Sequence, residues 1–110
     1  MLTVDKLGAA LGLEILCPGD PEREVKGGYC GDLLSWVMGR AAADDAWITV
    51  MGNVNAIAVA VLADVSCIIL ADSSALDADA RARAEQQGVA VLRSAQNQYD
   101  LCCALGRLIG

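Results

Sequence analysis

Three short apolar runs alternate with two helix-like segments in the second half of the chain. The runs are WITVM (47–51), CIIL (67–70) and VAVL (89–92), and the segments between them are NAIAVAVLA (55–63) and DADARARAEQQ (77–87). This β-α-β-α-β order is typical of a parallel sheet with helices on its faces. The segment 55–63 is apolar on every side, so it needs cover from the sheet and from a second surface.

The remaining segments complete one domain. We expect a first helix that Thr3 caps, extended segments over 13–17 and 24–29, a helix over 33–40 that Asp32 caps, and a last helix over about 96–108. Leu33, Leu34, Val37 and Met38 form the apolar stripe of the helix over 33–40. The sequence therefore predicts a single-domain three-layer α/β/α sandwich over 1–110, with a mainly parallel sheet of four or five strands.

Charge excludes two classes of partner. The chain carries 8 basic and 14 acidic residues, a net charge of −6, and its basic residues are scattered. Because no Lys/Arg cluster is available to neutralise phosphates, we expect neither a nucleic acid nor a membrane as partner. The residues after Met1 include Asp5 and Lys6 and no apolar leader, so we expect a cytoplasmic protein.

The residues that most catalytic sites need are scarce. The chain has no histidine and none of the GxxxxGK[ST], GxGxxG or GxSxG motifs. Its five cysteines include no CxxC spacing, and buried structural roles explain them best. The carboxylates considered for acid–base chemistry lie in loops or at helix starts, where capping explains them; they are Asp32, Asp44, Asp45 and Asp72. We therefore predict that the protein is not an enzyme and holds no metal or cofactor.

Polar loops follow the predicted strands. In open parallel sheets, ligands bind beyond the carboxyl ends of the strands, where helix N-termini also meet. The candidate ligand-binding residues in these loops are Gly52, Asn53, Asn55, Asp72, Ser73 and Ser74. The loop 94–97 and the turn 30–32 are expected near the same edge. Helix capping and turn formation are the alternative roles for the same side chains.

The apolar helix over 55–63 offers a candidate interface. Ile57, Val59, Val61 and Leu62 point in different directions around it, so one face packs on the sheet and the opposite face also needs burial. Either a neighbouring helix of the same chain or a second copy related by two-fold symmetry could provide this cover. The sequence alone leaves both possibilities open.

Nearly the whole chain resembles a stand-alone DRTGG domain. The likeness lies in VKGGYCGDLLSWVM (25–38), WITVMGNVNAIAVAVLADVSCIILA (47–71) and ARAEQQGVAVLRS (82–94). Such domains accompany phosphotransacetylases and CBS-containing pyrophosphatases, and they are similar to the N-terminal domain of HPr kinase/phosphorylase. The resemblance implies an α/β/α sandwich with a regulatory or assembly role. Asn53 and Val54 stand here where the family has its Asp-Arg pair.

Two functions follow as hypotheses. The first is a non-catalytic regulatory or protein-interaction module that forms a homodimer through the helix over 56–62, with another protein of the same pathway as a further partner. The second is a sensor that binds a nucleotide or another small anionic metabolite over 52–55 and 72–74, with backbone N–H groups as the ligands of the anion.

Overall fold

The computed structural model describes all residues, 1–110, as five helices and five strands. In chain order these are α1 (Val4–Leu11), β1 (Glu14–Cys17), β2 (Gly27–Cys30), α2 (Leu34–Arg40), β3 (Asp45–Thr49), α3 (Val54–Ala63), β4 (Cys67–Leu70), α4 (Ala78–Gln87), β5 (Val91–Arg93) and α5 (Gln98–Ile109). The expected elements are all present. Thr3 caps α1 by accepting a hydrogen bond from the Lys6 N–H at 3.3 Å.

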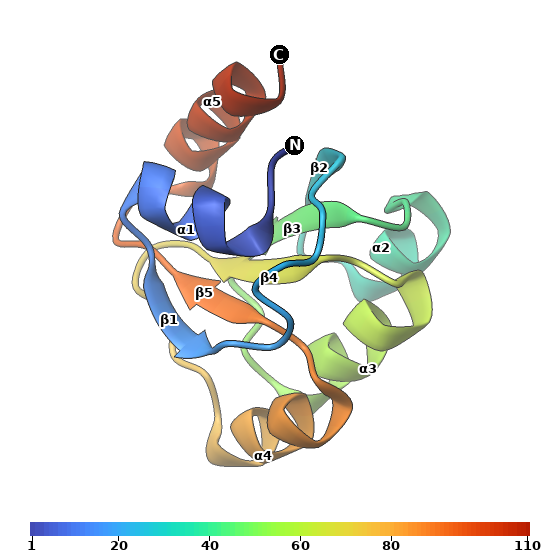
Figure 1. Cartoon of the computed structure of the whole chain (residues 1–110). Coiled ribbons are helices and arrows are strands. Elements are labelled where there is room, and N and C mark those ends of the chain that lie inside the picture. The colour runs from blue at the N-terminus through green and yellow to red at the C-terminus, as the bar shows by residue number, and fades with distance from the viewer.

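The five strands form one sheet in the order β1-β5-β4-β3-β2. The pairs β2–β3, β3–β4 and β4–β5 are parallel, whereas β1 lies antiparallel to β5 at one edge. Helices α1 and α5 cover one face of the sheet, and α2, α3 and α4 cover the other (Figure 1). This arrangement confirms the predicted three-layer α/β/α sandwich with a mainly parallel sheet.

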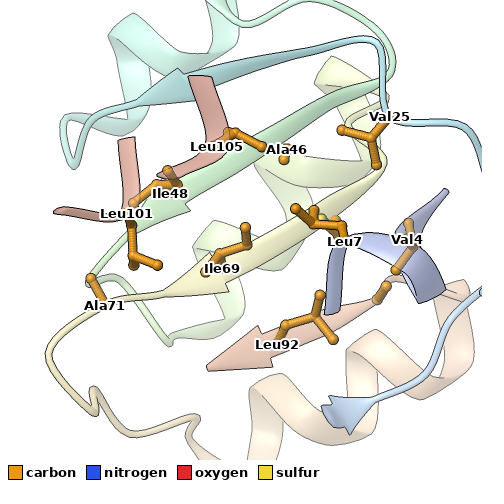
Figure 2. Packing of buried hydrophobic residues seen from close by; sticks show 12 residues of the cluster. Val4, Leu7, Val25, Ala46, Ile48, Ile69, Ala71, Leu92, Leu101 and Leu105 are labelled. Carbon is orange, nitrogen blue, oxygen red and sulfur yellow. The ribbon is translucent and has the colours of Figure 1, made fainter. Parts of the chain in front are cut away.

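Alternating side chains of the central strands divide the core in two. Ile48 and Ile69 point toward α1 and α5, where Leu7 and Leu101 pack on them (Figure 2). Trp47 and Ile68 point to the opposite side and pack beneath α2, α3 and α4. All residues of β3 and β4 are buried, as expected for strands that helices cover on both faces.

Helix α3 is covered mainly by its own chain. It packs on the sheet and lies between α2 and α4, so that Ala56, Ile57 and Ala60 are buried. Ile57, which we predicted as an interface residue, is only 1% exposed and belongs to the core. Val59 is half-buried, and only Val61 and Leu62 of the predicted set remain exposed.

Helix α2 differs from its expected pattern. Of the predicted apolar stripe, only Val37 is fully buried and Leu34 is half-buried, whereas Leu33 and Met38 are 58% and 44% exposed. The helix is seven residues long and lies outermost beside α3, so it buries a narrow face. No helix of the structure has both the length and the apolar character needed to cross a bilayer.

Candidate functional site at the carboxyl ends of the strands

The loops after β3 and β4 lie against each other. The Asp77 N–H donates a hydrogen bond to the Gly52 carbonyl at 2.9 Å, and a Cβ atom on Gly52 would collide with the carbonyl oxygen of Ala75. Asn53 caps α3 by accepting from the Ala56 N–H at 2.9 Å. The structure therefore brings Gly52 and Asn53 next to the loop after β4, while the Oδ1 atom of Asn53 is committed to the cap.

The loop after β4 is fixed through its backbone. Asp72 and Ser73 both have left-handed backbone angles, with φ of 55° and 53°. The Asp72 N–H donates to the carbonyl of Gln96 at 2.8 Å, and the Ser73 N–H donates to that of Ser94 at 2.9 Å. Ser74 donates both its N–H, at 3.0 Å, and its hydroxyl, at 2.6 Å, to the Ala71 carbonyl. The loop 94–97 thus joins the predicted site, but the N–H groups of 72–74 are already bonded.

Asp32 links three elements at this edge of the sheet. Its carboxylate accepts hydrogen bonds from the Thr49 hydroxyl at 2.7 Å, the Val50 N–H at 3.0 Å and the Gln98 side-chain amide at 3.0 Å. The prediction that Asp32 caps α2 was wrong, because Leu33 occupies the cap position and forms no side-chain cap. Asp32 instead connects the turn after β2 with the end of β3 and the start of α5.

Hydrogen bonding controls the ionisation of Asp32. Partial burial raises the pKa of this carboxyl, but the bonds from Val50, Thr49 and Gln98 outweigh burial and bring the pKa below its usual value. The ionised form therefore dominates at neutral pH. Two other predicted carboxylates lie at the opposite end of β3, where Asp44 pairs with Arg23 and Asp45 accepts from the Ala42 N–H.

A charged pair that the sequence did not reveal closes the site on the β1 side. Arg93, the last residue of β5, donates from Nε to Glu14 Oε1 at 3.0 Å and from Nη2 to Glu14 Oε2 at 3.1 Å. The antiparallel register places Glu14 directly opposite Arg93. The alternation of strands and helices predicts parallel neighbours. It therefore could not identify a pair that forms between antiparallel strands and joins residues 79 positions apart.

The cysteines occupy different surroundings. Cys17 and Cys67 are buried, while Cys30 is exposed and lies beside Cys102 in an apolar hollow of about 430 Å³ between β2 and α5. Partial burial, together with the Cys102 thiol and Asp32, raises the pKa of Cys30 to about 12. A thiol held in its protonated form is a poor nucleophile at neutral pH. No group of three or more potential metal ligands occurs in the structure.

Comparison with solved structures identifies a regulatory protein of the same fold. The chain superposes with a TM-score of 0.71 on the crystal structure of the CBS and DRTGG domains from the regulatory region of Clostridium perfringens pyrophosphatase, in complex with its activator diadenosine tetraphosphate. The alignment covers 97% of this chain and 45% of that one, at 16% sequence identity. No protein-family description and no curated protein matches the sequence. At this identity, the likeness establishes a shared α/β/α fold.

Replacing Asp32 by Asn should make stability less dependent on acid pH. Because the folded pKa lies below the unfolded value of about 3.9, the carboxylate stabilises the fold above that pH, and this contribution is lost as the pH falls through the folded pKa. We expect Asp32→Asn to cost about 1 kcal/mol at pH 7 in urea unfolding, and less at pH 3. Asp79→Asn, on the exposed face of α4, is the matched control. An equal cost at both pH values would contradict the assigned hydrogen bonds.

Replacing Gly52 by Ala tests the contact between the two loops. The added methyl group meets the Ala75 carbonyl, so we expect a loss of about 1–3 kcal/mol in the free energy of unfolding. Gly39→Ala is the control, since a Cβ at Gly39 in α2 meets open space and should stabilise the helix by about 0.5–1 kcal/mol. If Gly52→Ala is neutral in urea unfolding, the loops do not pack as described.

Proposed function

We propose that this chain is a non-catalytic regulatory module of the DRTGG type that forms a homodimer through α2 and α3. The fold shared with the regulatory region of a pyrophosphatase supports the regulatory role. A single observation carries the assembly: large apolar side chains remain exposed on two adjacent helices after the chain has folded. We call this surface the α2–α3 face; it consists of Leu33, Trp36, Met38, Val54, Val61 and Leu62.

The α2–α3 face combines apolar exposure with few charges. It holds six of the eleven large apolar side chains that the chain leaves exposed, with Leu62 at 69% and Trp36 at 52%. In α2 and α3 together, Arg40 is the only charged residue, and its guanidinium lies over the Trp36 ring at 3.7 Å. Arg83 of α4 also borders Val61 and Leu62, and no acidic residue lies in α2 or α3, so the acidic residues behind the net charge of −6 lie outside these two helices.

The exposed side chains of α3 form one stripe along the helix. Val54, Ala58 and Leu62 recur at the i, i+4 and i+8 positions on the side away from the buried Ala56 and Ala60, and Val61 lies at the edge of this stripe, one turn after the buried Ile57. A two-fold axis through such a stripe would pack it against its own copy. Burying apolar area contributes about 25 cal/mol per Å², which makes this stripe the favourable centre of an interface.

Placing a charge in this stripe should dissociate the dimer. We expect the wild type to sediment as a dimer at high micromolar concentration and Leu62→Glu to sediment as a monomer, because a buried glutamate would lack a partner. Tyr99→Glu is the matched control, since Tyr99 is 76% exposed on α5 and lies outside the α2–α3 face. A wild type that stays monomeric across the concentration series, or equal dissociation of both variants, would exclude this dimer. If the α2–α3 face instead binds a different protein, a heteromeric complex takes the place of the homodimer.

A sensor of a small anionic ligand is the second candidate function. Two observations favour it: three polar loops converge at the carboxyl ends of the parallel strands, and the pyrophosphatase regulatory region binds a nucleotide activator. Gly52, Asn53, Asn55, Asp72, Ser73 and Ser74 remain the candidate residues. The N–H groups of 72–74 are bonded within the fold, so the recognition must come from side chains and from the N–H groups of Val54 and Asn55 in the first turn of α3.

A thermal-shift screen tests the sensor function. We expect at least one nucleotide or phosphorylated metabolite, with diadenosine tetraphosphate and ATP included, to raise the melting temperature by several degrees. Saturation at a hundredfold excess over Kd contributes about 2.7 kcal/mol. Asn55→Ala should reduce the shift without lowering the melting temperature of the free protein, since Asn55 is exposed and is not the cap residue of α3. A screen without any shift would exclude the sensor.

A further inference from the structure

A polar hollow of about 420 Å³ lies beside the candidate loops, between the ends of β5 and α1. Its polar side chains are Glu14, Ser73, Arg93, Ser94 and Gln96. Arg93 is the only Lys or Arg that lines it. The hollow therefore combines the Arg93–Glu14 ion pair with hydroxyl and amide groups, and its guanidinium and hydroxyl donors are suited to bind oxygen anions.

Arg93 retains hydrogen-bonding capacity within this hollow. A guanidinium has five N–H donors, and Arg93 uses three of them: two on the Glu14 carboxylate and one, at 3.4 Å, on the Ser74 carbonyl. Two donors are left for another acceptor. Because Glu14 and Ser74 hold the guanidinium from two sides, its orientation is fixed before any ligand arrives.

Two hydroxyl groups complete the donor set. Ser94 accepts from the Gln96 N–H at 3.0 Å, and its own proton is free to be donated. Ser73 is exposed, and its N–H donates to the Ser94 carbonyl. Its hydroxyl takes part in no hydrogen bond within the fold and is therefore available to a ligand. Leu11 and Gly12 at the C-terminal end of α1 also line the hollow, and the negative end of the helix dipole there opposes an anion, so Arg93 and the two hydroxyls must outweigh it.

We propose that Arg93, Ser73 and Ser94 form a binding site for the oxyanion of a small metabolite, a carboxylate or a phosphate monoester. This proposal rests on the second proposed function, the sensor, and extends its site toward β5. The oxyanion accepts hydrogen bonds from the two remaining Arg93 donors and from the two hydroxyls. Glu14 orients the guanidinium, but its negative charge opposes the ligand and lowers the affinity.

Arg93 attracts the anion and Glu14 repels it, so replacing each of them should change the affinity in opposite directions. Arg93→Gln removes the cation, whereas Glu14→Gln removes the repulsion and keeps a side chain of the same shape beside the guanidinium. We expect Glu14→Gln to bind about tenfold more tightly than the wild type, and Arg93→Gln to lose binding. The pair is partly exposed, at 28% for Arg93 and 58% for Glu14, so both variants should fold.

Titration of the full chain at constant ionic strength measures these affinities. The probes are inorganic phosphate and succinate, followed by NMR shifts of the Arg93 Nε–H and the Ser73 amide, and they separate phosphate from carboxylate recognition. Tighter binding by Glu14→Gln together with no binding by Arg93→Gln supports the site. Equal binding by Arg93→Gln and the wild type overturns it while leaving a sensor with another site. The absence of shifts in both the wild type and Glu14→Gln also overturns it, and a positive nucleotide screen would then preserve the sensor function.

Discussion

The parallel pairing of β3 with β4, joined by the crossover helix α3, is the constraint on which the rest of the structure depends. Ala46 to Thr49 pair in register with Cys67 to Leu70, and all of these residues are buried between two helical layers. Since both strands run in the same direction, their carboxyl ends meet at one edge of the sheet, and the loops that follow them must converge there. The same crossover places α3 on the outer surface between α2 and α4.

The two ends of the sheet are held by different interactions. At the amino ends, Arg23 forms ion pairs with Asp44 at 2.9 Å and Asp64 at 3.0 Å, and it also donates to the Asp64 carbonyl. At the carboxyl ends, Asp32 and the backbone of 72–74 connect the loops through hydrogen bonds. Each end also has a polar hollow with a partly exposed arginine: about 420 Å³ beside Arg93 at the carboxyl ends, and about 190 Å³ beside Arg23 at the amino ends, where two aspartates already pair with the guanidinium.

The sequence predicted the sheet better than the site. The alternation of apolar runs with helical segments predicted β3, β4 and α3, because a strand that helices cover on both faces needs a nearly continuous run of apolar residues. The sequence did not predict the role of Asp32, because its partners Thr49 and Gln98 are distant in sequence. A carboxylate directly before a helix is most simply interpreted as a cap. The sequence also missed the pairing of Glu14 with Arg93, which depends on an antiparallel edge strand. Ile57 was assigned to an interface because periodicity cannot show which faces of an apolar helix its own chain covers.

The two surfaces on which the proposed function rests meet at one helix. The crossover helix α3 carries part of the apolar α2–α3 face, and it begins at the polar loops along the carboxyl ends of the strands. In the proposed function, a ligand bound at these loops would therefore act on the helix that carries the proposed association surface.

The most direct test of this account is the measurement of cross-strand nuclear Overhauser effects in the uniformly labelled protein. Parallel pairing predicts contacts between the backbones of Ala46 and Cys67 and between those of Thr49 and Leu70. Contacts that instead join Ala46 with Leu70 and Thr49 with Cys67 would show antiparallel strands. That result would separate the loops at the carboxyl ends and contradict the proposed site.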